Sequence, residues 1–148
     1  MAIVRGCNFP GGLFYDVPHH VWYRQEDDGS VRLGMTIVGV ALAREVLIFT
    51  PKRTGRPFDG GRAVATVESA KWVGSVRSCF AGSIEAVNER LVANAAPINT
   101  DCYGDGWMML VRPNDTGWSG HLVTGEAIAP AYEKWMEDNG FEGCGASI

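Results

Sequence analysis

The sequence predicts a mainly β protein, with a short helix after the first hairpin and a second helix near the C-terminus. Glycine accounts for 19 of the 148 residues, well above its usual share of about 7%. Glycine-rich chains that are not low-complexity contain many turns and therefore short strands. Short stretches of alternating polar and apolar residues recur between the turns, which is the pattern of half-buried strands.

The first hairpin is expected within residues 20–35. Residues 20–24 (His-Val-Trp-Tyr-Arg) are bulky and β-prone, and Asp-Asp-Gly-Ser at 27–30 is a strong turn signal. Residues 30–35 alternate between polar and apolar side chains and should form the returning strand. Residues 38–45 are rich in Ala, Leu and Val, and could hold two helical turns.

The middle of the chain predicts more short strands. Residues 46–50 (Val-Leu-Ile-Phe-Thr) read as a fully buried strand that Pro51 stops, and the polar segment 51–57 has no periodicity. Residues 88–98 read as a polar connection. Alternating segments predict further strands at 62–69, 80–87 and 106–112. In the first of these, three apolar residues should share one face: Ala63, Ala65 and Val67.

Residues 129–140 predict the C-terminal helix. Pro130 suits its first turn, and Gly140 suits the position just past its end. Three apolar side chains recur at helical spacing, those of Tyr132, Trp135 and Met136. We expect this face to pack on the sheet as a cap.

Size and composition narrow the class of protein. A chain of 148 residues is expected to form a single domain, with its core at about residues 15–139 and flexible termini. The net charge of -4 and the pI near 5.3 argue against a nucleic-acid partner. No apolar run approaches the roughly 18–20 residues that span a membrane. The start lacks the features of a secretory signal, so a cytoplasmic protein is expected.

The four cysteines show no metal-binding spacing. Cys7, Cys79, Cys102 and Cys144 contain no C-x-x-C pair and no zinc-ligand pattern. In a reducing compartment they should be thiols. Cys7 and Cys144 lie near the termini, where a transient disulfide is possible.

The most informative residue is Lys71, one of three lysines in the chain. Residues 61–68 and 82–89 both run from a glycine through alternating apolar residues to an acid, and they flank Lys71 on either side. This weak symmetry predicts two similar strands with the lysine at a hairpin tip. A carrier lysine must be exposed, mobile and free of a salt-bridge partner, and a turn supplies such a position.

The segment around Lys71 resembles a known attachment motif. Residues 67–71 (Val-Glu-Ser-Ala-Lys) are similar to the lipoylation motif V-E-S-V-K of the H protein of the glycine cleavage system. Residues 20–22 resemble that family's H-x-W, and 78–89 its S-P-x-S-G-x-V-x-x-V-N-E. Residues 99–107 are similar to N-x-D-P-Y-G-x-G-W, and 131–135 to the terminal A-Y-x-x-F/L. Five motifs in the same order cover about residues 15–139.

The resemblance implies a lipoyl-domain fold, a barrel-sandwich hybrid of two small antiparallel sheets. It also implies lipoic acid in amide linkage to Lys71, with Glu68 and Ser69 read by a lipoate-attaching enzyme. His20 matches a family histidine near the stowed arm, although a half-buried strand histidine is an equal reading. Two structural glycines would let strands turn and approach closely, Gly61 and Gly82. The residues around the arm would be Ala70, Trp72, Val73 and Gly74.

The sequence also departs from ordinary H proteins. Their acidic stretch before the lipoyl hairpin is replaced by residues 49–62, which contain four basic residues and one acid. Charge of this kind selects partners. The usual Asp four residues after the lysine is replaced by Ser75. Trp72 follows the lysine in place of a small residue, either as an exposed recognition anchor or as packing under the turn.

These departures resemble a second branch of the same family, the lipoate-binding proteins of bacterial sulfur oxidation. Residues 50–56 (Thr-Pro-Lys-Arg-Thr-Gly-Arg), 67–74 and 7–10 carry that resemblance. It implies a dihydrolipoyl arm that shuttles a sulfur intermediate with a heterodisulfide-reductase-like complex. The alternative is a glycine cleavage H protein that carries an aminomethyl group. Dihydrolipoamide dehydrogenase is a possible further partner.

Other classes have less support. An enzyme using His19, His20, His121 or the cysteines lacks any H-x-x-x-H, nucleophile elbow or Cys/His constellation, so we expect no catalytic or metal site. A biotin carrier would place methionines beside the lysine, where Ala70 and Trp72 stand. An unmodified scaffold domain of the same fold stays open.

Overall fold

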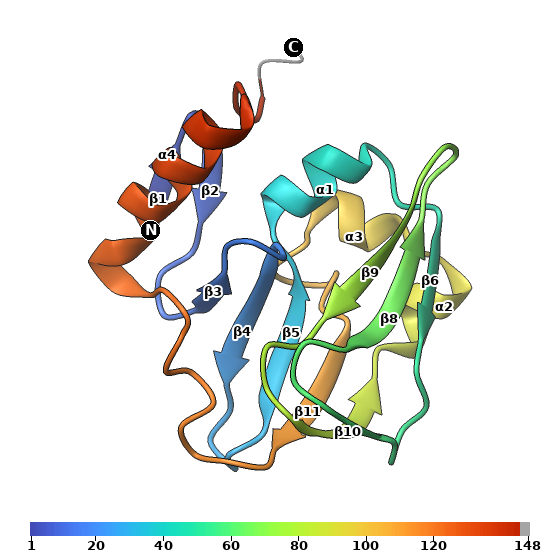
Figure 1. The fold of residues 1–148 in the computed structure, drawn as a ribbon. Coiled ribbons are helices and arrows are strands. Elements are labelled where there is room, and N and C mark those ends of the chain that lie inside the picture. The colour runs from blue at the N-terminus through green and yellow to red at the C-terminus, as the bar shows by residue number, and fades with distance from the viewer. Residues whose placement is uncertain (146–148) are drawn as a thin grey trace.

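The computed structural model describes residues 1–145 and contains three antiparallel sheets with helices around them (Figure 1). The large sheet has six strands in the order β3-β4-β5-β11-β10-β7. Their bounds are Phe14–Asp16, Val21–Gln25, Val31–Met35, Met109–Pro113, Gly82–Val87 and Pro57–Phe58. The predicted first hairpin is β4 and β5, and its register pairs Tyr23 with Leu33.

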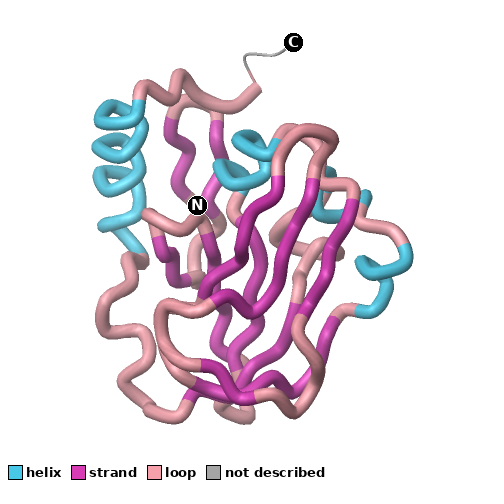
Figure 2. Tube along the Cα trace, turned by 45° about the vertical axis from the view of Figure 1, so that its right-hand side comes forward, coloured by secondary structure: helices cyan, strands magenta, loops and turns pink. Residues whose placement is uncertain are grey.

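The second sheet has three strands in the order β6-β8-β9. Their bounds are Ile48–Pro51, Ala63–Glu68 and Val73–Arg77. Figure 2 shows this sheet facing the large one. Apolar side chains of both sheets share one core cluster, for example Val64 and Val76 with Leu33 and Ile84. Neither sheet closes into a barrel.

Helices occupy the edges of this sandwich. Helix α1 (Ile37–Ala43) follows the first hairpin, as the composition predicts, and the Thr36 hydroxyl accepts the Gly39 N–H at its start. Helix α4 (Ile128–Asn139) follows the short 3-10 turn Gly125–Ala127 and ends at Gly140, whose φ is 64°. No helix within residues 1–145 combines the length and apolar character that a membrane crossing requires.

The connection predicted at residues 88–98 is helical instead. It contains α2 (Glu89–Ala93) and the start of α3 (Ala96–Thr100). Each helix has five residues and buries a single apolar side chain. One buried residue per helix produces no repeating pattern, so periodicity could not reveal either element.

Two strand predictions need correction. Residues 46–50 do not form a fully buried strand, because β6 begins at Ile48 and lies at a sheet edge, with Leu47 and Ile48 about half exposed. Pro51 belongs to this strand, which an edge permits. In β8 a register shift between Ala63 and Ala65 places the neighbours Val64 and Ala65 both inside, so strict alternation fails.

The termini differ most from expectation. The N-terminus is not loose, because β1 (Ala2–Val4) and β2 (Cys7–Phe9) form a third sheet. Helix α4 packs against this hairpin (Figure 1), and its buried face also joins a core cluster with Tyr15 of β3 and Trp22 of β4 in the large sheet. The Tyr132 ring stacks on Phe9 with centroids 4.1 Å apart.

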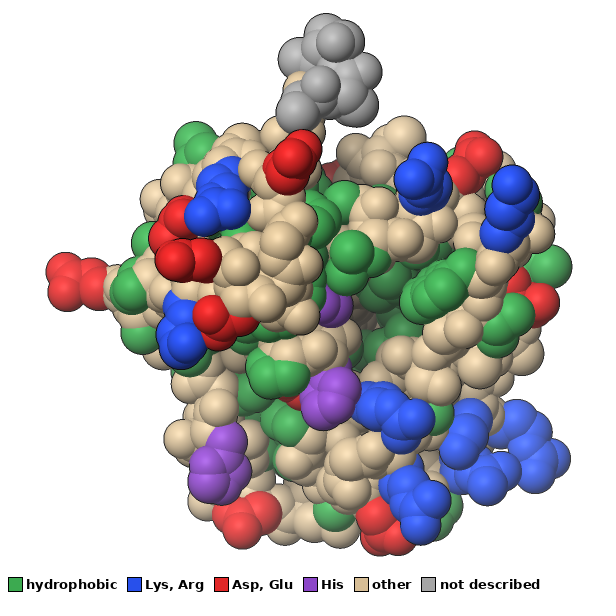
Figure 3. Space-filling model, turned by 45° about the horizontal axis from the view of Figure 1, so that its top comes forward, with side chains coloured by type: hydrophobic (Ala, Val, Ile, Leu, Met, Phe, Trp, Pro, Cys, Tyr) green, Lys and Arg blue, Asp and Glu red, His purple; other side chains and the backbone are tan. Residues whose placement is uncertain are grey.

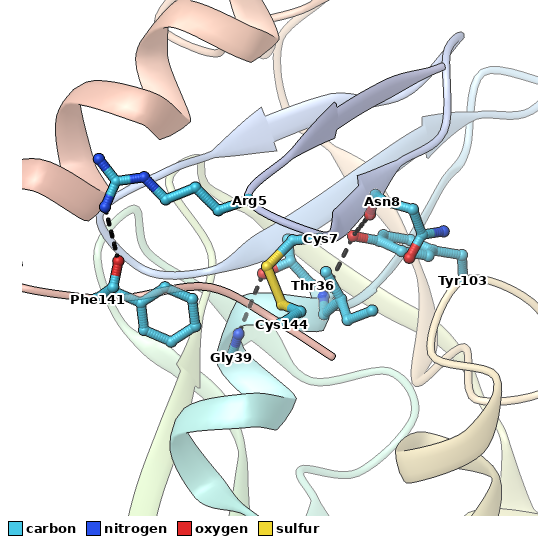
Figure 4. The surroundings of a disulfide bond; sticks show 9 residues. Arg5, Cys7, Asn8, Thr36, Gly39, Tyr103, Phe141 and Cys144 are labelled. Atoms are coloured by element: carbon cyan, nitrogen blue, oxygen red, sulfur yellow. Dashed lines mark hydrogen bonds between the residues drawn. A yellow bond between two sulfur atoms is a disulfide. The ribbon is translucent and has the colours of Figure 1, made fainter. Parts of the chain in front are cut away.

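Two cysteines are paired, where thiols were expected. Cys7 of β2 and Cys144 form a disulfide with Cα atoms 4.9 Å apart (Figure 4). Backbone and side-chain contacts close the same junction: the Cys144 N–H donates to the Arg5 carbonyl at 3.0 Å, and Arg5 donates to the Phe141 carbonyl. The chain ends therefore meet, which is the geometry a disulfide needs. Cys79 is half-buried and Cys102 is buried, and both are free.

Candidate functional site

Lys71 lies at the tip of the hairpin formed by β8 and β9. The two strands pair to their ends, where Glu68 lies opposite Val73. The Ser69 N–H donates to the Trp72 carbonyl at 2.8 Å and closes the turn. Residues 69–72 therefore project as a short, backbone-defined loop beyond the sheet (Figure 1).

The Lys71 side chain is exposed and has no acidic neighbour. No carboxylate of the described residues lies within 4.0 Å of its Nζ. Lys134 differs, since its Nζ contacts Asp138 Oδ2 at 2.8 Å. An unpaired amine at the end of a flexible stem is free to meet a modifying enzyme.

Trp72 is 41% exposed and packs over its own hairpin. A Cβ placed on Gly74 would lie 2.1 Å from the Trp72 Cη2 atom, so the indole occupies the space that Gly74 leaves. Trp72 is therefore both partly exposed and packed against the turn. Its neighbour Val73 is 66% exposed.

A cleft separates the hairpin tip from the C-terminal end of α1. It has a volume of about 560 Å³. Leu42, Arg44, Glu45 and Leu47 line one side, and residues 69–72, Lys71 included, line the other. Figure 3 shows this hollow with apolar side chains on its floor and Lys and Arg side chains at its rim.

A smaller cleft of about 220 Å³ adjoins the first. Leu42 and Trp72 line both clefts, so the two spaces are neighbours along the hairpin. The second cleft adds His19 and His20 from the segment before β4, and Arg77 from the end of β9. Lys71 thus stands at one end of a continuous depression that leads to two histidines.

His20 lies in the second cleft in an unusual environment. Its φ is 58°, and its ring packs edge-on against Trp135 with centroids 4.5 Å apart. Burial lowers the pKa of His20 to about 4, although Asp16 acts in the opposite direction. The imidazole is therefore neutral near pH 7, and within the described residues its buried Nδ1 has no hydrogen-bond partner.

The remaining residues named by the resemblance take distinct positions. Glu68 and Ser69 are half-exposed at the end of β8, and Ala70 is exposed beside Lys71. Gly61 has a φ of 82° in the turn before β8. Gly82 lies where a Cβ would come within 2.5 Å of the Arg112 carbonyl oxygen, so it permits close approach of β10 and β11.

Three of the four basic residues that replace the family's acidic stretch share one surface, which Asp59 also lines. Lys52, Arg56 and Arg62 line a shallow depression together with Arg77, which comes from a distant strand. None of the four has a carboxylate of residues 1–145 within 4.0 Å. Because Arg77 also lines the second cleft, this basic surface reaches the depression beside Lys71.

Sequence reasoning missed three contributors to the site. The end of α1 forms a cleft wall, Arg77 joins the basic surface, and Asp16 contacts His19. The adjacent histidines at 19 and 20 are visible in the sequence, whereas nothing there marks Asp16 as the hydrogen-bond partner of His19. No cluster of three or more His, Cys, Asp or Glu side chains suited to a metal occurs in the described part of the chain.

Comparisons with known proteins agree with this geometry. The family model described as "Glycine cleavage H-protein" matches residues 13–137. Glycine cleavage system H protein 5 of Aquifex aeolicus is 37% identical over 98% of this chain and all of its own length. H protein 3 of the same organism is 40% identical over 74% of this chain and 68% of its own.

A solved structure gives the same result at the level of the fold. The crystal structure of a glycine cleavage system H protein from Mycobacterium marinum superposes with a TM-score of 0.72 at 29% identity. The match covers 89% of this chain and 99% of that one. The family model alone matches most of the sequence. The chain belongs to the glycine cleavage H-protein family.

Proposed function

We propose that the chain is a lipoyl carrier in which lipoic acid forms an amide with Nζ of Lys71. The observation that carries the proposal is an exposed amine, without an acidic neighbour, at the apex of a tight hairpin. Proteins of the glycine cleavage H family are lipoyl carriers rather than catalysts. The position of Lys71 in the V-E-S-x-K motif supports it as the attachment point.

The residues around the hairpin fit such a group. The closed turn holds Glu68 and Ser69 in a fixed relation to the lysine, so a lipoate-attaching enzyme can read backbone and side chains together. The adjoining clefts offer apolar walls from Leu42 and Trp72 for an alkyl chain. When bound, lipoic acid supplies a disulfide that is reduced to a dithiol and can carry a group between enzymes.

The family match supports the glycine cleavage role for this arm. In that role the arm carries an aminomethyl group between a glycine decarboxylase and an aminomethyltransferase, and dihydrolipoamide dehydrogenase reoxidises it. The named relatives and the solved structure are all described as glycine cleavage system H proteins. We take this as the first candidate for the pathway.

The second candidate is carriage of a sulfur intermediate with a heterodisulfide-reductase-like complex. It is favoured by the basic surface of Lys52, Arg56, Arg62 and Arg77, where ordinary H proteins are acidic. Enzymes adapted to an acidic face should meet this surface with like-charge repulsion. Two of the relatives come from one organism, so a single cell can hold more than one H-type carrier.

Lipoylation is tested by intact mass. After coexpression with a lipoate-attaching enzyme, the wild-type protein should gain one lipoyl mass, and Lys71→Arg should gain none. Lys52→Arg and Lys134→Arg are matched controls, because they remove the other two lysines and should leave the added mass unchanged. Modification of the Lys71→Arg protein would contradict the assignment.

The pathway is tested by reconstitution. The lipoylated protein is supplied to glycine decarboxylase and aminomethyltransferase, and glycine-dependent release of carbon dioxide is measured. Rates like those of an ordinary H protein would support the first candidate and reject the second. If wild type is poor but an Arg56→Glu, Arg62→Glu variant improves, the basic surface selects against glycine cleavage enzymes.

A further inference from the structure

The mouth of the smaller cleft holds a histidine that is fixed by a buried carboxylate. Asp16 ends β3 and is 7% exposed. Its Oδ2 lies 2.9 Å from Nδ1 of His19, and its Oδ1 accepts the His19 backbone N–H at 3.4 Å. Both carboxylate oxygens therefore orient His19, whose side chain remains 47% exposed.

This pairing decides which ring nitrogen is available. A carboxylate at Nδ1 favours the tautomer with hydrogen on that nitrogen and leaves Nε2 as the free base. Nε2 of His19 makes no hydrogen bond to any residue from 1 to 145. His19 lines the cleft that continues to Trp72 and the hairpin tip, so its exposed edge belongs to the depression beside Lys71.

The other charged groups around the cleft favour an anion there. Arg77 of β9 lines the same cleft and donates to the Gly61 carbonyl at 3.0 Å, which restrains its guanidinium. His20 is neutral near pH 7 because of its burial and adds no charge. In the adjoining cleft, Arg44 balances the single acid Glu45, because Lys71 carries no charge once its Nζ is an amide nitrogen. Asp16 is the one carboxylate in contact with His19.

We propose that Asp16 and His19 act as an acid–base pair for a thiol at the end of an arm on Lys71, with Arg77 favouring the thiolate. Nε2 of His19 accepts the thiol proton, the imidazolium is stabilised by Asp16, and no electrons are transferred. The reverse step returns the proton to sulfur. This inference rests on the proposed lipoylation of Lys71, and it names the residues of this chain that would adjust the reactivity of the arm.

The pair of Asp16 and His19 would assist sulfur transfer. The thiolate, not the thiol, attacks a disulfide or a sulfane sulfur, and a neighbouring cation raises the thiolate fraction near neutral pH. A histidine held by a carboxylate can supply both a base and, once protonated, that cation. An arm folded into the depression would then carry a more acidic thiol than one extended into water.

The test is a pH titration of thiolate ultraviolet absorbance on the lipoylated, reduced protein. Unmodified Lys71→Arg protein, reduced in the same way, provides the background from the chain's own cysteines. In the wild type, we expect the lower of the two thiol pKa values of the arm to be about one unit below the same value in His19→Ala. This difference corresponds to about ten times more thiolate at a given pH below both values. Asp16→Asn should raise the thiol pKa as His19→Ala does, and His121→Ala should match wild type, because His121 lines neither cleft.

The outcomes distinguish failure of the proposed lipoylation from failure of the acid–base role of Asp16 and His19. Intact mass is measured first, and absence of a lipoyl group on Lys71 would overturn the proposed function and this inference together. A lipoylated protein whose thiol pKa is the same in wild type, His19→Ala and His19→Gln would overturn the inference alone. Thermal melts of each variant establish that the fold is retained. As an independent readout, the nitrogen NMR signal of His19 Nε2, measured at one fixed pH, should differ between the protein with the reduced arm and the protein without it.

Discussion

The hairpin tip and the terminal unit of β1, β2 and α4 differ in how exposed their side chains are and in how firmly those side chains are held. At the tip, Lys71 has no acidic partner within 4.0 Å among the described residues, Trp72 is partly exposed and Val73 is largely exposed. In the terminal unit, Phe9 and Tyr132 are completely buried and a disulfide joins the ends. The difference shows where this chain keeps its stability and where it keeps a reactive group free. The variants below test that division.

The largest effect is expected at the centre of the terminal unit. Tyr132→Ala removes a fully buried ring that stacks on Phe9 and should lower the free energy of unfolding by about 3–5 kcal/mol. Chemical denaturation measures this change. Tyr132→Phe keeps the ring and is the control. A loss below about 1 kcal/mol for the alanine variant would mean that α4 contributes little to the fold.

The disulfide should have the next largest effect. Cys144→Ser opens a link between residues 137 positions apart and should lower the free energy of unfolding by about 2–4 kcal/mol. Reduction of the wild type with dithiothreitol should have the same effect, whereas reduction of the variant should change nothing further. Equal melting temperatures for oxidised and reduced wild type would show that the link is dispensable.

Acidification should destabilise the fold through His20, which lines the smaller cleft and packs against Trp135 of α4. Its pKa falls from 6.5 to about 4 on folding, so between these values the unfolded chain binds the proton more tightly. The free energy of unfolding should therefore decrease as pH falls from about 6.5 to about 4, by about 1–2 kcal/mol after allowance for partial exposure. His20→Asn tolerates the positive φ and does not titrate. The difference between the two pH profiles isolates His20, and parallel profiles would contradict the assignment.

The smallest effects are expected at the two lysines. Lys134→Gln breaks a fully solvent-exposed pair with Asp138 and should lower the free energy of unfolding only slightly. Lys71→Gln breaks no ion pair and should change the free energy of unfolding by less than that. Paired thermal melts check both. A marked destabilisation by Lys71→Gln would show that the lysine is structural, against its role as a carrier.

The sequence was sufficient for the elements with a strong local pattern. The first hairpin and α4 have turn or capping signals within a few residues, α1 has a composition that favours a helix, and similar strand patterns flank the turn around Lys71. The N-terminal hairpin was missed because β1 and β2 have three residues each and are held by distant partners in α4. Short strands stabilised by long-range contacts leave no periodic signal.

Part of the site could also be predicted, because some of its residues form a local sequence motif. Lys71, Glu68 and Ser69 lie in one continuous motif, so sequence alone identifies them as candidates. Asp16 and His19 are three residues apart and meet within one turn between β3 and β4. The convergence of Arg77 with Lys52 depends instead on how separate strands are placed. Such contacts follow from tertiary packing, which a single sequence without its fold does not express.

The link between Cys7 and Cys144 makes most of the polypeptide a covalent ring. A protease that cuts one loop between these positions would leave two segments still joined, and the nicked chain would separate only after reduction. Comparison of digests on gels with and without reductant would therefore map the exposed loops without loss of either piece. The same closure makes this chain a candidate for circular permutation, with new ends opened in a loop of the sandwich.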